Sequence, residues 1–191
     1  SSRQMLESGD WVVPHFLDEA RLKKPVLTYW CQATAMKWFG VNAWSARLPS
    51  VVATVLALAV LAVAVGRYDD ARTATWTVFI YGTSLLAIAA AKMAITDALL
   101  TLFILSAQVC LFRVYIGRGG WGTMVLMGLS IGLAGLTKGP VVIGVLVMTI
   151  GALIVLRLLE RIWPNPQTPP SRVTSQPLRP LRMILKLLVV L

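Results

Sequence analysis

Three short polar motifs interrupt an otherwise apolar chain, and they hold residue types suited to chemistry at a membrane surface. The motifs are LKKP at 22–25, TD at 96–97 and TKGP at 137–140. Each contributes one charged group of interest, namely Lys24, Asp97 and Lys138. Ammonium groups bind phosphates, carboxylates bind cations or accept protons, and ionisable groups beside membrane spans usually serve a function.

Each of these residues also has a purely structural interpretation. Lys24 is followed by a proline and then by Tyr29 and a second aromatic residue, so its ammonium group could simply extend to headgroup level. Asp97 opens an apolar segment and could cap a helix there together with Thr96. Lys138 precedes a Gly-Pro pair that must form a turn, where a lysine can be merely solvated. The residues alone leave both interpretations open, and for Asp97 the two can coexist.

The histidine and the cysteines offer less. His15, in WVVPHF, is the single histidine, and a lone histidine in a loop is more often structural than catalytic. Cys31 and Cys110 lie in or beside apolar segments without metal-type spacing, which is typical of buried, unreactive thiols. The sequence predicts no cofactor and leaves a divalent cation open.

The composition places most of the chain in lipid. Hydrophobic residues make up 57% of the 191 residues and charged ones 14%, and the mean hydropathy is +0.74. A crossing needs roughly 20 residues, so the length allows about five spans with some flanking loop. Ser1 is not an initiator methionine, and the apolar run 181–191 is about half a crossing long. We therefore expect an internal fragment of a longer protein.

The apolar segments predict an all-α fold, a polytopic transmembrane helix bundle with an extracytoplasmic loop containing interfacial helices. The expected spans are 48–66, 76–91, 97–115, 121–136 and 141–156. The corresponding domains are the extracytoplasmic loop 1–47, the five-span bundle 48–156, a basic cytoplasmic loop 157–180 and the start of a further, truncated span 181–191. Within the loop, helices are expected over SSRQMLES and over 26–39.

Local residues refine these elements. In 26–39 most apolar side chains fall on one helical face, with Gln32 off that face, and Gly40 supplies a stop. Pro49 is expected in the first turn of the first span, where proline is tolerated. The fourth span contains Gly128, Gly132 and Gly135, which favour close helix approach in a bilayer.

Basic residues predict the orientation, because cytoplasmic loops carry an excess of lysine and arginine. One set follows the first, third and fifth spans and is assigned to the cytoplasm: Arg67, Arg72, Arg113, Arg118, Arg157, Arg161, Arg172, Arg179, Arg182 and Lys186. Segment 1–47 and the joints KMAITD and TKGP then share the opposite side. That side has basic residues of its own: Arg3, Arg21, Lys23, Lys24, Lys37 and Arg47. Such an excess predicts an anionic ligand such as a lipid phosphate.

Charge and motifs exclude several functions. The net charge is +10, but its clustering beside membrane spans argues against a nucleic-acid partner. The chain has no Walker loop, paired Cys or His metal set, GxSxG motif or ladder of transmembrane arginines. ATP hydrolysis, zinc chemistry, serine hydrolysis and voltage sensing therefore have no support.

The chain resembles the amino-terminal half of bacterial polyprenyl-phosphate-dependent glycosyltransferases. The segments that carry the resemblance are, in order, SRQMLESGDWVVPHF, LKKPVLTYW, FGVNAWSARLPS, AKMAITDALLTLF and GLAGLTKGP. Such GT-C membrane enzymes are related to the dolichyl-phosphate-mannose protein mannosyltransferases and to the aminoarabinose transferase that modifies lipid A. The similarity covers nearly all of residues 1–156 and specifies the superfamily, not the substrate.

The resemblance implies a large enzyme of the bacterial inner membrane with several crossings. A sugar on an undecaprenyl-type phosphate would pass, with inversion, to an acceptor outside the cytoplasm. Lys24 would contact the carrier phosphate, Asp97 would line the same cavity, and Lys138 matches the lysine of the family's KGP turn. His15 and Tyr29 are the other candidates for binding substrate.

Two further points follow from the resemblance. The family's catalytic acidic pair would lie just ahead of Ser1, so the catalytic residues themselves are not assigned. Many relatives have an acidic residue where this chain has Lys23, and any metal or sugar contact made by that acid is not expected here.

The expected partners are a polyprenyl-phosphate-linked sugar, an acceptor that is a lipid, a protein or a glycan, and membrane lipids. The alternative is a segment of a polytopic transporter or flippase, in which Asp97 and the lysines line a substrate path across the bilayer. A noncatalytic scaffold subunit is a further alternative, with the same polar residues as ordinary loop residues.

Overall fold

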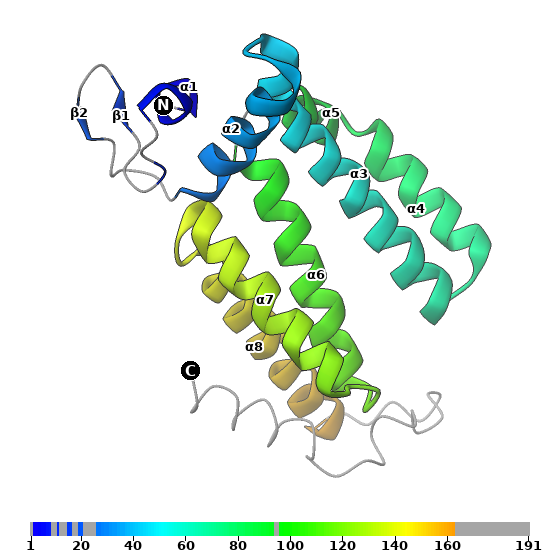
Figure 1. Ribbon diagram of the computed structural model, residues 1–191. Helices are drawn as coiled ribbons and strands as arrows, with labels where there is room; N and C mark the ends of the chain where they lie inside the picture. Colours follow the sequence, from blue (N-terminus) through cyan, green and yellow to red (C-terminus); the bar gives the residue numbers. More distant parts are fainter. Residues whose placement is uncertain are drawn as a thin grey trace.

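A computed structural model describes residues 2–8, 11, 15–16, 19–20, 26–93 and 96–162. This part of the chain is almost entirely helical (Figure 1), and the prediction of an all-α bundle is confirmed. The exception is a pair of two-residue antiparallel strands, β1 (His15–Phe16) and β2 (Glu19–Ala20), in which His15 pairs with Ala20. Residues 157–162 of the predicted loop 157–180 are helical in the structure, whereas residues 163–180 and the predicted span 181–191 lie outside the described residues.

Two short helices precede the bundle, and both were expected. They are α1 (Ser2–Ser8) and α2 (Leu27–Phe39). Gly40, at φ 80°, follows α2 in a conformation that favours glycine, which explains the stop. Gln32, expected off the apolar face of this helix, is nevertheless buried, and its side-chain oxygen accepts a hydrogen bond from the Ser2 hydroxyl of α1.

The first long helix, α3 (Ala43–Tyr68), begins five residues before the predicted span. The cause is a capping box. The Asn42 side chain accepts a hydrogen bond from the Ser45 N–H at 2.8 Å, and the Ser45 hydroxyl accepts one from the Asn42 N–H at 3.3 Å. Pro49 therefore lies inside the helix and not in its first turn. Its missing N–H leaves one helical hydrogen bond unmade.

The second predicted span is divided in two. Helices α4 (Ala71–Thr83) and α5 (Leu85–Lys92) are bent by 60° at Ser84. The Ser84 hydroxyl accepts a hydrogen bond from the Ala87 N–H at 3.3 Å and so starts a new helix there. The interruption has a local cause that hydropathy alone does not reveal.

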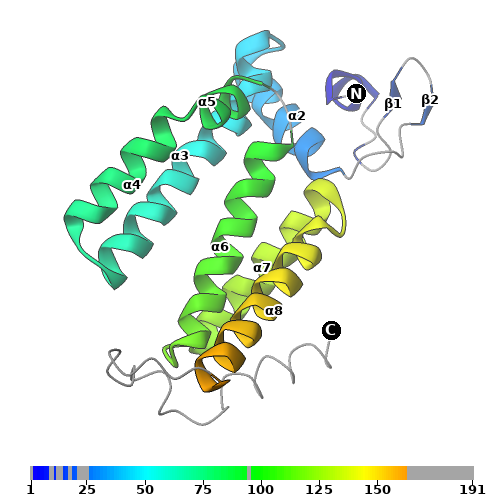
Figure 2. The same ribbon diagram turned by 180° about the vertical axis from the view of Figure 1, so that it is seen from behind.

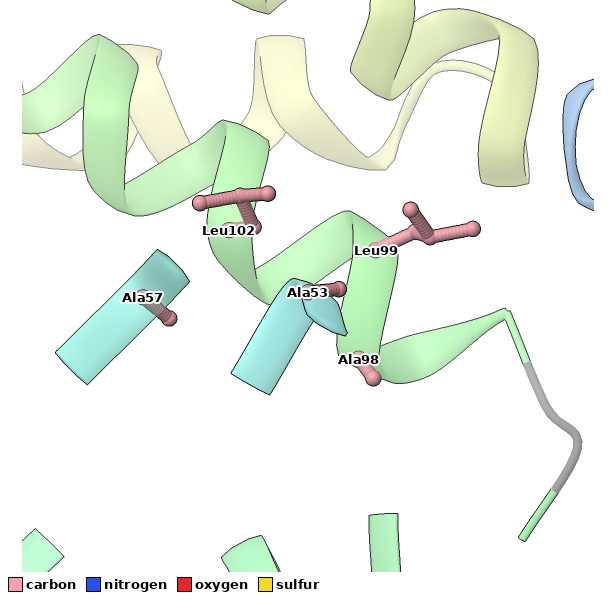
Figure 3. Packing of buried hydrophobic residues seen from close by; sticks show 5 residues of the cluster. All are labelled: Ala53, Ala57, Ala98, Leu99 and Leu102. Atoms are coloured by element: carbon pink, nitrogen blue, oxygen red, sulfur yellow. The ribbon is translucent and has the colours of Figure 1, made fainter. Parts of the chain in front are cut away.

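Three helices complete the bundle: α6 (Asp97–Tyr115), α7 (Trp121–Lys138) and α8 (Val141–Ile162). Their starts match the predicted ones, and α8 continues past 156. Helix α6 lies between α3 on one side and α7 and α8 on the other (Figures 1 and 2). Ala53 and Ala57 of α3 are small enough to let α6 approach, and they pack against Leu99 and Leu102 (Figure 3).

The glycines of α7, which were expected to favour close helix approach, make no such approach to another helix in the described structure. An added Cβ atom at Gly128, Gly132 or Gly135 would meet nothing within 4 Å in the described structure. The buried residues of α7 lie elsewhere on the helix, and they are Met127, Ser130, Ala134 and Thr137.

Three described helices are long and apolar enough to cross a membrane, namely α3, α6 and residues 141–159 of α8. The bent pair α4–α5 would add a fourth crossing if it forms one span. Helix α7 falls outside this group, since its glycines, Thr137 and Lys138 lower its hydropathy. The number of five crossings stays a prediction. We call the end where α6 begins the upper end, as it lies in Figure 1, and the end where α6 finishes the lower end.

Candidate functional site

Asp97 and Lys138 form an ion pair at the upper end of the bundle. The Lys138 Nζ donates a hydrogen bond to Asp97 Oδ1 at 2.6 Å. About half of each side chain is exposed, 48% for Asp97 and 50% for Lys138. The two residues are 41 positions apart in the sequence. The pair places the TD and TKGP motifs at the same end of the bundle, while the prediction that this end faces one side of the membrane stays a prediction.

The helices explain why both charges are stable there. Asp97 occupies the first turn of α6, and Lys138 is the last residue of α7. A carboxylate is stabilised at a helix N-terminus and an ammonium group at a C-terminus, by up to about 1 kcal/mol at exposed positions. Gly139, at φ 71° and ψ −142°, ends α7 immediately after the lysine. With α7 ending there, Lys138 lies close to the start of α6, where it meets Asp97.

The alternative role for Asp97, capping α6 with Thr96, is not what the structure shows. Thr96 has helical backbone angles and makes no capping hydrogen bond through its side chain. The Asp97 carboxylate pairs with Lys138 instead. The pair leaves the exposed ammonium group with donor capacity for a further anion, since a lysine has three N–H donors.

The other predicted site residues differ in how far the structure places them. Tyr29 is half-buried in the first turn of α2. Helix α2 packs against α3 and also contacts α7, so Tyr29 belongs to a helix at the same end of the bundle as the ion pair. His15 belongs to β1, and nothing is described for its side chain. Lys24 lies outside the described residues.

Spacing in the sequence could not reveal how the amino-terminal segment is attached to α2. The Ser2 hydroxyl donates to Gln32 Oε1 at 2.8 Å, and this hydrogen bond is buried. The Trp30 indole N–H donates to the Trp11 carbonyl oxygen at 2.6 Å. The partners are 30 and 19 residues apart, and no motif connects them. These bonds fix α1 and the Trp11 backbone beside α2.

Cys31 and Cys110 are both free thiols; Cys110 is buried, as expected, whereas Cys31 is only half-buried. Burial raises the pKa of the Cys31 thiol, so little reactive thiolate forms at neutral pH. In the described part of the chain, no group of three or more His, Cys, Asp or Glu residues could hold a metal ion.

Comparison with known proteins connects this arrangement to a family of sugar transferases. Residues 1–186 match the family described as dolichyl-phosphate-mannose-protein mannosyltransferase. The chain is 36% identical over 154 residues to an undecaprenyl phosphate-alpha-4-amino-4-deoxy-L-arabinose arabinosyl transferase from Edwardsiella ictaluri, covering 78% of the chain and 28% of that protein. The enzyme of the same name from Pectobacterium carotovorum is 37% identical over 145 residues, covering 72% of the chain and 26% of that protein.

Two solved structures are also similar to this chain. The crystal structure of ArnT from Cupriavidus metallidurans in the apo state superposes with a TM-score of 0.76 at 26% identity, over 98% of this chain and 33% of that one. The structure of the same protein bound to undecaprenyl phosphate gives a TM-score of 0.66 at 25% identity, over 99% and 34%. The chain spans less than a third of the length of the curated relatives cited here.

Proposed function

The chain belongs to the dolichyl-phosphate-mannose-protein mannosyltransferase family, and from this premise we propose that it forms part of a membrane glycosyltransferase. The enzyme would move a sugar from a polyprenyl-phosphate carrier to an acceptor outside the cytoplasm. The relatives named as undecaprenyl phosphate aminoarabinose transferases support an undecaprenyl-type carrier. The acceptor would be a lipid, a protein or a glycan, and the membrane a bacterial inner membrane.

The observation that carries the proposal is the half-exposed ion pair between Asp97 and Lys138 at the upper end. Sugar transfer breaks the bond between the anomeric carbon and the carrier phosphate, and the electron pair of that bond stays on the phosphate oxygen. A nearby ammonium group stabilises the charge that develops there. Lys138 is held ready for this role by Asp97, which fixes its position without burying it.

Asp97 is assigned a positioning role rather than that of a base. Its carboxylate is paired with an ammonium group at 2.6 Å, and it lies at a helix N-terminus. Both interactions engage the carboxylate in holding Lys138 in place, which is the role we assign to it. Among residues with described side chains it is the only carboxylate at the upper end, so we assign the base for the acceptor hydroxyl to none of them.

Lys24, Tyr29 and His15 complete the proposed substrate site. Lys24 would bind the carrier phosphate, because it belongs to the KP motif that the resemblance assigns to this contact. Tyr29 supports the proposal by lying in a helix at the same end as the ion pair. His15 would line the site from the loop, and domain 1–47 would then be its extracytoplasmic cover.

A transporter or flippase is the second candidate, and one observation favours it. Helices broken within the membrane often form transport sites, and α4–α5 is bent by 60°. One observation argues against it. The polar side chains of Gln108 in α6 and Thr149 in α8 are hydrogen bonded to each other at 2.8 Å, so they do not require a substrate as a hydrogen-bond partner. The charged groups named above lie at helix ends.

The test is an assay of the full-length protein with undecaprenyl phosphate-linked aminoarabinose and with a mannose-linked donor, following the release of undecaprenyl phosphate. We expect release that depends on an acceptor fraction and is strongly reduced by Lys24→Ala or Lys138→Ala, with membrane insertion intact. Lys37→Ala is the control, since this exposed lysine lies in the last turn of α2 as Lys138 lies in the last turn of α7. Movement of intact donor across vesicles without any release would support the transporter instead.

A further inference from the structure

A groove opens between α3 and α6 toward the lower end of the bundle, away from the Asp97–Lys138 pair. Its volume is about 300 Å³, at the small end of the range for ligand pockets. The walls are apolar along most of its length and become basic at one end; they consist of Leu56, Ala59, Val60, Val63, Ala64, Arg67, Tyr68, Val109 and Arg113.

The packing of the two helices explains where the groove lies. Near the upper end, Ala53 and Ala57 allow α3 to contact α6 directly. Toward the lower end the two helices diverge, as both views show (Figures 1 and 2). At the lower end only side chains bridge the two helices: the rings of Tyr68 and Phe112 pack edge to face, with their centroids 5.0 Å apart. The groove is the space left between these two contacts.

The basic end of the groove has cations without matching anions. Arg67 and Arg113 line it, and neither makes an ion pair in the described part of the chain. The Nε atom of Arg113 is buried and has no hydrogen-bond partner there. The nearest carboxylates in sequence are Asp69 and Asp70, and Asp70 is occupied in capping α4 through the Thr73 N–H at 2.7 Å.

We propose that this groove binds one anionic phospholipid, with its phosphate between Arg67 and Arg113 and an acyl chain along the apolar walls. Two guanidinium groups at the end of membrane-length helices match a lipid phosphate in charge and depth. The buried, unpartnered Arg113 Nε identifies the donor that the headgroup would satisfy. This site lies at the opposite end from the proposed transfer site and does not depend on sugar transfer.

The test uses the full-length protein, stripped of lipid and titrated with phosphatidylglycerol or phosphatidylcholine, with bound lipid measured by native mass spectrometry. Three variants are compared: the double variant Arg67→Gln/Arg113→Gln, the filling variant Ala59→Phe, which keeps both charges, and the control Arg72→Gln/Arg118→Gln. The control removes the same charge at the lower end from residues outside the groove. Melting temperatures show which variants are folded.

We expect one tightly bound phosphatidylglycerol, preferred over phosphatidylcholine by about fivefold or more, and a loss of about fivefold in affinity for each groove arginine removed. Ala59→Phe should also weaken binding, while the control should stay within about twofold of wild type. The proposal is overturned by equal binding of the two lipids, by an equal loss in the control, or by unchanged binding in the groove variants. If the double arginine variant does not fold, Ala59→Phe decides the question alone.

Discussion

Asp97 and Lys138, the first residue of α6 and the last of α7, are joined by a 2.6 Å ion pair that links two antiparallel helices at one end of the bundle. The pair is half exposed, so water screens it and its contribution to stability is small, about 1 kcal/mol or less. Its value to the proposed function lies in position, since it holds a cation where a carrier phosphate could reach it.

Removing one partner of this pair should therefore affect activity far more than stability. For Asp97→Asn we expect a fall in sugar transfer on the order of tenfold, because Lys138 loses its fixed position. For Lys138→Ala we expect a fall on the order of a hundredfold, because a charge that stabilises the leaving group is gone. The free energy of unfolding should change by about 1 kcal/mol or less in both. The reversed pair Asp97→Lys/Lys138→Asp places each charge at the unfavourable helix end, so it should restore neither the stability nor the transfer, and recovery of transfer would contradict this assignment.

Gly139, in the turn between α7 and α8, should be sensitive to substitution by any residue with a side chain. Its backbone, at φ 71° and ψ −142°, is accessible almost only to glycine, while an added Cβ atom would meet nothing within 4 Å. Gly139→Ala should thus destabilise the protein by about 1–3 kcal/mol through backbone strain alone, and it should reduce transfer by displacing Lys138. Gly122→Ala, in the first turn of α7 and equally free of contacts, should cost nothing. Thermal unfolding in detergent measures both, and equal effects would contradict the explanation.

Asn42 should determine where α3 begins. Asn42→Ala removes the acceptor for the Ser45 N–H and should destabilise the protein by about 1 kcal/mol. Asn42→Asp keeps an acceptor at the same position and should retain most of the stability. Unfolding free energies of the two variants check this expectation, and an Asp variant as unstable as the Ala variant would argue against the capping box.

The hydrogen bond between Gln108 and Thr149 should couple α6 to α8 inside the membrane. In a double-mutant cycle with Gln108→Leu and Thr149→Val, we expect a coupling free energy of about 0.6 kcal/mol, with an upper value near 2 kcal/mol. The Thr149 hydroxyl also donates to the Val145 carbonyl within its own helix, so Thr149→Val removes two hydrogen bonds and only the full cycle isolates the one to Gln108. A coupling of zero would show that the two side chains do not interact in the bilayer.

Much of the fold could be predicted because long apolar runs and short polar joints leave few alternatives in a membrane. The starts of α6, α7 and α8 follow directly from Asp97, from the Gly-Gly pair before Trp121 and from Pro140. The start of α3 could not be derived from hydropathy, because a local capping box with Asn42 sets it. The break at Ser84 is similar, since a single hydroxyl begins a new helix within an apolar run.

The candidate site was predictable only in part, for a related reason. Grouping the polar joints by side brought Asp97 and Lys138 together in the sequence analysis, and the ion pair confirms it. The attachment of Ser2 to Gln32 and of Trp30 to Trp11 depends on contacts between distant residues, which no spacing rule reports. The roles of Lys24, His15 and Tyr29 stay predictions.

The affinity of the full-length protein for undecaprenyl phosphate, measured for wild type, Lys138→Gln and the matched control Lys37→Gln, tests the central claim most directly. Losing one charged hydrogen bond to the phosphate should weaken binding by about tenfold in Lys138→Gln, while Lys37→Gln should bind as wild type does. Equal affinity of all three proteins would contradict the claim that the Asp97–Lys138 pair marks the binding site of the carrier phosphate.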